Sequence, residues 1–333
     1  MTWFAWRQFR IPSWITAAAL LAVAVLLAIT GHNLVDEWNA SGAATCHGDC
    51  GGALTTFIQR ATTGAEGIAF QLTTVLLYAM PALIGIFWGA PMLARELESG
   101  TYRLAWNQSI TRTRWLGTKL AVGGAASALS AGLLSWAVTS WGHHLDHARY
   151  YRILPVMFGA RGIVPIGYAL FAFALGVTMG MLIRRTVPAM AATLAIYVAA
   201  VVSMPLWVRA HLAPAVHGTM PLDLSSIDIL SIGQNSVMTV RSGVTPSNAW
   251  VLTNNTITPS GKIFTGPADP THCGDGGPRE CIQWLSTLGL RERLTYQPAS
   301  HFWQLQWMET GMFVAAAALL TAFCFWFIRN RLT

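Results

Sequence analysis

Residues 162–208 read GIVPIGYALFAFALGVTMGMLIRRTVPAMAATLAIYVAAVVSMPLWV, and this stretch decides the class of fold. Two apolar runs without Asp, Glu, Lys or Arg lie on either side of Arg184 and Arg185. Each run is long enough to cross a membrane, because a helix needs about 20 mostly apolar residues to span a hydrocarbon core roughly 30 Å thick. The turn between the runs is short, so the stretch predicts two neighbouring, antiparallel membrane helices.

The composition of the whole chain has the same character. Of its 333 residues, 53% are apolar and only 11% are charged, whereas soluble domains carry roughly 25% charged residues. So few charges cannot cover a water-facing surface, which excludes an ordinary soluble enzyme, a disordered protein and a repeat solenoid. The formal net charge of +7 is not a nucleic-acid footprint, since few basic residues lie among stacking aromatics. We therefore expect an integral membrane protein without a nucleic-acid partner.

Six stretches lack charged residues over the length of a membrane span. They predict an all-α polytopic membrane protein with six transmembrane helices. The first stretch is too long for the apolar region of a cleavable signal peptide, so no such signal is expected. Pro81 and Gly85 in the second stretch and Pro205 in the fifth predict helix kinks. The six stretches are 11–31, 67–94, 120–142, 162–183, 186–208 and 310–328.

The Lys and Arg residues are distributed unevenly between the loops. With the N-terminus inside, the inner segments hold 11 of the 21 basic residues in about 42 positions. The outer segments then hold the other 10 in about 155 positions. Because basic residues in short loops favour the cytoplasmic side, we expect a multi-pass protein of the cell membrane with both termini in the cytoplasm.

The chain is expected to divide into four parts. Residues 1–10 carry Trp and Arg, which predicts an amphipathic segment at the inner interface or a plain positive anchor. Residues 11–208 form helices one to five and include an inner coupling loop at 95–119. Residues 209–309 are rich in Pro, Gly, Ser and Thr, which indicates an irregular extracellular domain with room for a few strands. Residues 310–333 form the sixth helix and a cytoplasmic tail.

Four of the five cysteines, Cys46, Cys50, Cys273 and Cys281, fall on the outer side of the predicted topology. This placement favours disulfides, which persist in oxidising compartments. The local pairs Cys46–Cys50 and Cys273–Cys281 are the simplest connectivity, although four cysteines allow three connectivities.

The inner loop is the most informative segment for function. Residues 91–119 read PMLARELESGTYRLAWNQSITRTRWLGTK. The run Ser99-Gly100-Thr101 breaks the helix, and Glu96 and Glu98 are the only acidic residues on the predicted inner side. The loop has no nucleophile–base pair and no metal cluster, so it predicts a docking surface and not a catalytic centre.

This loop resembles that of type-2 ABC transporter permeases. In that family a Glu-rich helix is followed by a Gly-Thr break, a short coupling segment, a Ser/Arg turn and a closing Lys. The matching residues here are RELESGT at 95–101, SITR at 109–112, Trp115 and Lys119. The likeness extends to six spans and a large loop before the sixth. It is closest to permeases of high-GC Gram-positive bacteria, where the RRTVPAM pattern at 184–190 also recurs.

The resemblance implies the membrane half of an ATP-driven exporter. The permease would pair with a second copy, as a homodimer, and with two separate ATPase subunits. ATP and Mg²⁺ would bind to those subunits, because this chain lacks the Gly-x-x-x-x-Gly-Lys-Ser/Thr phosphate loop and holds no cofactor itself. Alternatively, Glu96 and Glu98 only solvate a helix end and pair with Arg95 or Arg103. The implied ATPase-coupling residues are Arg95, Glu96, Glu98, Gly100, Thr101, Tyr102 and Arg103.

Two further groups of residues are candidate sites. Glu309 is the one acid at the edge of a predicted span, which makes it a candidate outer gate that pairs with Arg209 or a histidine; alternatively, it is an interfacial carboxylate that reaches water. Aromatic side chains of the second and fourth spans line an amphipathic substrate path or face lipid. These aromatics are Tyr78, Phe87, Trp88, Phe171 and Phe173.

Histidines at the end of the third span offer a third possibility. His143, His144 and His147 with Asp146 have helical spacing that suits Zn²⁺ or Cu²⁺, although histidines that only cap the span are an equally simple explanation. We expect no metal site here.

Three functions remain to be compared. The first is an exporter permease for an amphipathic drug, antibiotic, peptide or lipid. The second is a membrane sensor or assembly partner that binds a ligand with its extracellular domain. The third, an intramembrane enzyme, lacks every expected motif, so we expect a transport subunit surrounded by membrane lipid and without catalytic residues of its own.

Overall fold

The computed structural model describes residues 2–47, 50–100, 111–149, 151–233, 237–243, 246, 249–273 and 277–331. Within them, six helices are long and apolar enough to cross a membrane, which confirms the polytopic helical fold. The spans are Ser13–Ala40, Ala65–Glu98, Arg112–Trp141, Val164–Ile183, Thr186–Leu212 and Ala299–Asn330.

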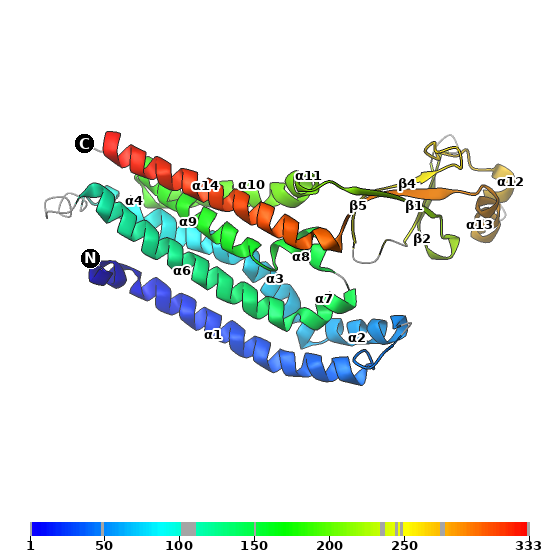
Figure 1. Ribbon diagram of the computed structural model, residues 1–333, viewed down its shortest axis with the longest axis horizontal. Helices are drawn as coiled ribbons and strands as arrows, with labels where there is room; N and C mark the ends of the chain where they lie inside the picture. Colours follow the sequence, from blue (N-terminus) through cyan, green and yellow to red (C-terminus); the bar gives the residue numbers. More distant parts are fainter. Residues whose placement is uncertain are drawn as a thin grey trace. The chain divides into compact units, whose positions relative to one another are not determined.

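The chain forms two compact units. The first comprises Met1–Leu212 and Trp303–Thr333, and the second comprises Ala213–Phe302. The helices of the first unit run roughly side by side as a bundle (Figure 1). They are α1 (Thr2–Ala40), α2 (Gly51–Thr63), α3 (Ala65–Ile84), α4 (Ala90–Glu98), α6 (Arg112–Trp141), α7 (His143–Arg149), α8 (Pro155–Gly159), α9 (Val164–Ile183), α10 (Thr186–Ser203), α11 (Arg209–Leu212) and α14 (Phe302–Asn330).

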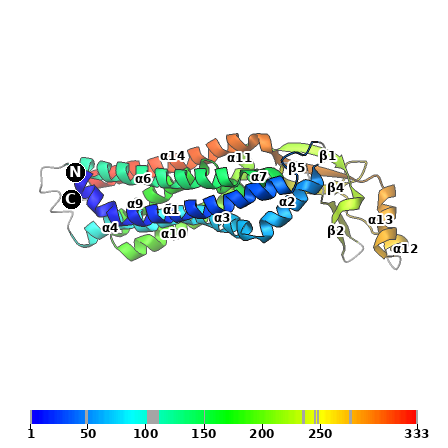
Figure 2. The same ribbon diagram turned by 90° about the horizontal axis from the view of Figure 1, so that it is seen from below.

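Both chain termini lie at one end of this bundle, as two perpendicular views agree (Figures 1 and 2). We call this the terminal end; α4 ends there and α6 begins there. The opposite end, where α7, α8 and α11 lie, is called the distal end. The two ends carry different polar contacts: Glu96 and Glu98 lie at the terminal end, and the Arg209–Glu309 ion pair lies at the distal end.

α9 is the central helix of the bundle. Most of its residues are buried, whereas α1 exposes large apolar side chains along its length, including Trp14, Ile15, Leu21 and Ile29. α9 packs against α3, α4, α6 and α10. A helix that is apolar all round belongs inside a bundle, while the exposed apolar surface of α1 suits lipid.

Glycines let α9 approach the second span at backbone contact. Gly85 and Gly89 lie in a π-helical turn, Gly85–Gly89, which joins α3 to α4. A side-chain carbon on Gly176 of α9 would lie 2.2 Å from the Gly85 carbonyl oxygen, and one on Gly180 would lie 2.4 Å from the Ala90 oxygen. Gly85 and Gly89 are four residues apart, as are Gly176 and Gly180. Small residues at this spacing let membrane helices pack closely.

The predicted kinks coincide with π-helical turns. The turn Gly85–Gly89 follows Pro81, and a second π-helical turn, Met204–Val208, contains Pro205 and joins α10 to α11. Proline removes a backbone donor and pushes against the preceding turn, which favours such local rearrangement.

The second unit is a small mixed domain. Strands β1 (Val216–Pro221), β5 (Arg291–Pro298) and β4 (Ala249–Ile257) form an antiparallel sheet in that order, and β2 (Ile227–Ile232) pairs with β3 (Met238–Ser242). Two short helices, α12 (Pro270–Cys273) and α13 (Gly277–Thr287), complete the described part. The core includes Met238, Val240, Leu285 and Leu290.

Polar turns close this domain. The Asp269 carboxylate accepts hydrogen bonds from the Thr271 hydroxyl, the His272 ring and the Thr271 backbone N–H, and these contacts lower its pKa to about 2. The Asp223 carboxylate likewise accepts from Ser225 and Ser226, which lowers its pKa. Such side-chain bonds to nearby backbone groups are typical of turns.

The disulfides have the simplest connectivity. Cys46 is bonded to Cys50, and Cys273 of α12 is bonded to Cys281 of α13. Cys324 is free and buried in α14. Each bridge closes a short loop within its own unit.

The expected part boundaries differ from the observed ones. Residues 2–10 belong to the helical backbone of α1, which runs from Thr2 to Ala40. The second unit begins at Ala213 and ends at Phe302, so it is shorter than 209–309. Residues 209–212 and 303–309 are helical because Arg209 and Glu309, which limited the charge-free runs, neutralise one another. The second unit contains two sheets, so the few expected strands are present and the unit is more regular than expected.

The glycine contacts predict an asymmetric response to one added methyl group. Gly176→Ala should destabilise the bundle by about 1–3 kcal/mol, because the new carbon meets backbone that cannot move alone. Gly311→Ala in α14 is the control, since nothing lies within 4 Å of that position. Thermal unfolding of the purified protein, monitored by the reaction of Cys324 with a thiol dye, measures both. Equal midpoints for the two variants would contradict this packing.

Candidate functional site

α4 ends where the sequence predicts a break. The Ser99 hydroxyl donates to the Arg95 carbonyl at 2.8 Å, and Gly100 follows with a φ of +71°. Glycine adopts this left-handed conformation without strain and commonly terminates helices. Thr101, Tyr102 and Arg103 of the expected coupling set lie outside the described residues. The chain is described again from Thr111, whose hydroxyl accepts from the Arg114 N–H at the start of α6.

Glu96 is held by Lys119 of α6. The Lys119 ammonium forms an ion pair with the Glu96 carboxylate and is itself only 3% exposed. It also lies 4.5 Å from the centre of the Trp115 ring, within the range of a cation–π contact. A buried ammonium requires such a partner, because an unpaired charge in a low-dielectric interior is costly.

Glu98 is held by the first residue of α10. Its carboxylate oxygen Oε2 accepts from the Thr186 hydroxyl at 2.8 Å and from the Thr186 backbone N–H at 3.1 Å. The first N–H groups of a helix have no partner within the helix, and an acid near them is also favoured by the helix dipole. Glu98 therefore caps α10 from another helix.

The two acids of the coupling motif thus connect α4 to α6 and to α10. The alternative expectation is that they pair with Arg95 or Arg103. The described partners are Lys119 and Thr186 and not Arg95, whereas Arg103 lies outside the described residues. Sequence reasoning overlooked both partners. The position of Lys119 could have indicated its pairing, because a lysine at the start of a long apolar run needs an acidic partner when it is buried.

At the distal end, Arg209 of α11 and Glu309 of α14 form a bidentate ion pair. Arg209 Nε donates to Glu309 Oε2 at 2.7 Å, and Nη2 donates to Oε1 at 2.9 Å. Both side chains are fully buried. The sequence suggested Arg209 or a histidine as the partner of Glu309, and the structure shows Arg209. The alternative, a carboxylate that reaches water, is not observed, because Glu309 is buried.

Two other elements, α8 and α9, supply further contacts to this pair. The Tyr168 hydroxyl of α9 donates to Glu309, and Arg209 Nη1 donates to the Pro155 carbonyl of α8 at 2.6 Å. The guanidinium also lies 4.4 Å from the Phe158 ring centre. The pair therefore joins α8, α9, α11 and α14 at one point.

Gln306 of α14 caps α9 in the same region. Its side-chain oxygen accepts from the backbone N–H groups of Ile163 and Val164 at 2.9 and 3.1 Å, and its nitrogen donates to the Phe158 carbonyl at 3.0 Å. The segment 155–163 is thereby fixed between α9 and α14. Tyr78 of α3 adds a bond to the Val156 carbonyl at 2.7 Å.

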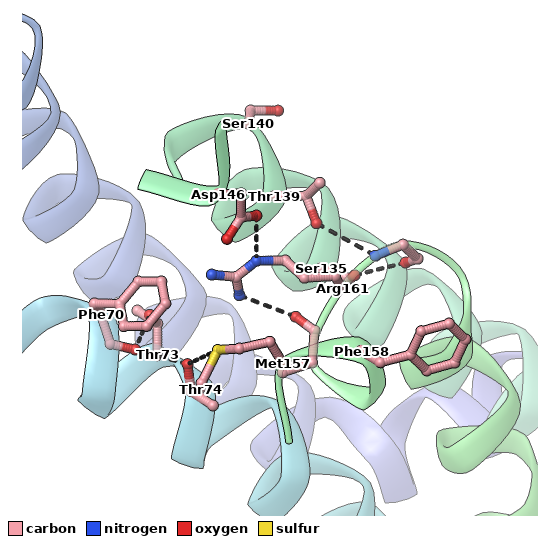
Figure 3. A network of polar contacts seen from close by, with 12 residues as sticks. Phe70, Thr73, Thr74, Ser135, Thr139, Ser140, Asp146, Met157, Phe158 and Arg161 are labelled. Atoms are coloured by element: carbon pink, nitrogen blue, oxygen red, sulfur yellow. Dashed lines mark hydrogen bonds and ion pairs between the residues drawn. The ribbon is translucent and has the colours of Figure 1, made fainter. Parts of the chain in front are cut away.

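A second buried ion pair holds the end of this segment (Figure 3). Arg161 Nε donates to Asp146 Oδ2 of α7 at 2.9 Å, and Nη1 donates to the Ala160 carbonyl at 3.1 Å. The next residue, Gly162, has a φ of +66°, and its carbonyl accepts from the Ser135 hydroxyl of α6 at 2.6 Å. Segment 155–163, which is partly buried, is thus held at the entry into α9 by hydrogen bonds with α3, α6, α7 and α14.

Of the candidate metal ligands, Asp146 and His144 have other described contacts. Among the described residues, no group of three His, Cys, Asp or Glu side chains is placed to hold a metal ion. Asp146 binds Arg161, and the His144 ring lies 5.3 Å from the Trp38 ring. The side chain of His147 lies outside the described residues.

The aromatic path residues fall into two groups. Phe87 and Trp88 line a groove of about 540 Å³ between α1 and the α3–α4 span, with contributions from Leu134 of α6 and Met190 of α10. Phe171 and Phe173 are buried in α9, and Tyr78 makes the hydrogen bond described above. The first group therefore faces an open space.

Comparison with known families matches this architecture. The family model "ABC-2 membrane transporter related" matches residues 17–209, more than half of the chain. The chain belongs to this family. It is an ABC-2 type permease, a multi-pass membrane subunit of an ABC transporter, and permeases of this family generally work with an ATPase subunit. No curated protein and no solved structure matches the chain.

The distal ion pair predicts a large penalty for removing one partner. Glu309→Gln leaves the buried Arg209 charge without an anion, which should cost about 3–5 kcal/mol of stability. The double variant Arg209→Met/Glu309→Leu should recover part of that loss, because no charge is left unpaired. Thermal unfolding measured by Cys324 labelling compares them. Glu37→Gln is the control, since Glu37 forms an exposed pair with Arg60 worth at most about 1 kcal/mol.

Proposed function

We propose that this permease is the membrane half of an ATP-driven exporter. It works as a homodimer with two ATPase subunits in the cell membrane, and both termini face the cytoplasm. The terminal end of the bundle is then the cytoplasmic end, and the unit Ala213–Phe302 is extracellular. The uneven distribution of Lys and Arg supports this orientation.

The observation that carries the proposal is the pair of anchors at the end of α4. Glu96 is bound to Lys119 of α6, and Glu98 is bound to Thr186 of α10. The segment that follows α4 therefore leaves from a point where three spans are tied together. An ATPase that displaces this segment moves α4, α6 and α10 as a group.

In this proposal the coupling residues have two different roles. Glu96 and Glu98 transmit movement, because their carboxylates already contact the bundle. Thr101, Tyr102 and Arg103 contact the ATPase, with Gly100 as the pivot between the two sets. Arg95 is considered below.

The distal end supplies the outer gate. Glu309 and Arg209 fix the segment 155–163 against α9 and α14, and closure there would separate the substrate path from the outside. An amphipathic substrate would use the groove beside Phe87 and Trp88, whose surfaces are apolar. A drug, an antibiotic, a peptide or a lipid has this character.

Loss of the Glu98 cap should uncouple the ATPase. We expect Glu98→Ala to bind the ATPase encoded beside the permease but to lose permease-dependent ATPase stimulation about fivefold or more, a typical coupling free energy. Gly100→Pro should act likewise, because proline cannot adopt the positive φ of Gly100. The control is Glu37→Ala, near the C-terminal end of α1 and far from the coupling motif, which should retain ATPase stimulation. The measurement is ATP hydrolysis by the purified complex.

Two outcomes would contradict the proposal. If no ATPase co-purifies with the wild type, the permease is not coupled in this way. If the complex forms but Glu98→Ala and Gly100→Pro behave as wild type, the loop is only a connector.

The alternative function is a membrane sensor or assembly partner. Its supporting observation is that the unit Ala213–Phe302 has its own core, two sheets and a disulfide. This alternative predicts that exposed substitutions on that unit change a signal or an assembly, while ATP hydrolysis by the complex stays constant.

A further inference from the structure

The groove beside α1 differs from the rest of the apolar surface in one respect. Of its lining residues, Arg95 alone carries a charge, and Thr16 is the other polar side chain. All other lining side chains are apolar, including Ile15, Ala19 and Phe87. The groove therefore combines a long apolar wall with one cation at the terminal end of the bundle.

The charge of Arg95 is not neutralised by the acids beside it. Glu96 is bound to Lys119, and Glu98 is bound to Thr186. Within the described part of the chain, the Arg95 guanidinium forms no ion pair and donates no hydrogen bond. It is exposed, and it presents five donors in a planar fork that suits phosphate oxygens.

The dimensions of the groove suit a lipid chain. Its wall on the second span extends from Leu76 to Arg95, a helical rise of roughly 28 Å at 1.5 Å per residue. This length exceeds the ~15 Å that one leaflet contributes to a hydrocarbon core of ~30 Å, so the groove has room for a whole acyl chain, and Arg95 lies at its end, where a headgroup would be. The volume of about 540 Å³ falls in the range of ligand sites, roughly 300–1,000 Å³.

We propose that the groove between α1 and the α3–α4 span binds an anionic phospholipid, with its phosphate on Arg95 and an acyl chain against Ile15, Ala19 and Phe87. Basic residues between membrane helices attract anionic headgroups, and arginine binds phosphate bidentately. The inference deepens the proposed function, since it names the ligand class of the same groove. Because Arg95 also begins the coupling motif, a bound headgroup would lie within one residue of Glu96.

The test uses the full-length permease in phosphatidylcholine nanodiscs without the ATPase. A photoreactive acyl chain is carried either by phosphatidylglycerol or by phosphatidylcholine, and the labelled peptides are mapped. We expect phosphatidylglycerol to label residues 15–23 and 76–95 preferentially. Arg95→Gln should reduce this labelling about fivefold, the effect of losing roughly one basic contact, and should leave phosphatidylcholine labelling unchanged.

Matched variants separate the site from general surface charge. Arg329→Gln removes an exposed arginine of the last turn of α14 that does not line the groove, and labelling should stay as in the wild type. Ala19→Trp fills the groove and should reduce labelling by phosphatidylglycerol at both peptides. Both positions are exposed, so the fold should tolerate the changes.

Three results would overturn the inference. Equal labelling by the two lipids would show that Arg95 selects no headgroup. Equal losses in Arg95→Gln and Arg329→Gln would assign the effect to surface potential. If Ala19→Trp weakens self-association of the permease and leaves labelling intact, a second copy covers the groove. The labelling test contains no ATPase, so its result is independent of the ATP hydrolysis measurement. Lipid binding can therefore fail while the coupling proposal survives, and the coupling proposal can fail while lipid binding survives.

Discussion

The ion pair between Arg209 and Glu309 has no access to water, and the arrangement of the distal end depends on that fact. Transfer of either charge alone into the bundle would cost several kcal/mol, so each side chain must meet the other before α11 and α14 can pack. The one nitrogen left over, Arg209 Nη1, then donates to the Pro155 carbonyl, and Glu309 Oε1 also accepts from the Tyr168 hydroxyl. One requirement for neutrality thus fixes the positions of four elements.

The backbone N–H groups at the helix ends also need partners from other parts of the chain. The first N–H groups of a helix have no partner within the helix, whether it begins at a buried position, as α9 does, or at an exposed turn, as α10 does. α9 and α10 meet this requirement with side chains borrowed from other spans: Gln306 supplies the oxygen for α9, and Glu98 supplies it for α10. Each cap therefore fixes the register of one span against another. A substitution at either residue changes both a helix end and a helix–helix contact.

The sequence predicts the number of spans well, because charge-free length is a one-dimensional property. Their ends are predicted less well for a specific reason. Arg209 and Glu309 stop the charge-free runs, yet both are helical and buried, because each cancels the charge of the other across 100 residues of sequence. Nothing in the local pattern shows that pairing. The sheets of Ala213–Phe302 were only partly foreseen, since strands as short as Met238–Ser242 give a weak alternating signal.

The candidate coupling site shows a similar division. The helix break at Gly100 follows from local residue types, whereas the partners of Glu96 and Glu98 come from α6 and α10. The glycine contacts are only partly predictable. The motifs GIFWG at 85–89 and GVTMG at 176–180 are visible in the sequence, but the contact between them is not.

These contacts form a continuous physical connection between the two ends of the bundle. α4 begins beside the backbone contact of Gly85 and Gly89 with Gly176, so displacement of α4 cannot leave α9 unaffected. α9 is held at its other end by Gln306 and by the Tyr168 hydroxyl on Glu309. Close-packed backbone transmits strain because no flexible side chain separates the helices. The π-helical turns at 85–89 and 204–208 interrupt the regular ladder of the described spans; the first directly precedes α4, and the second directly precedes Arg209. A movement that starts at Gly100 therefore has a rigid path through α4 and α9 to the ion pair at Glu309.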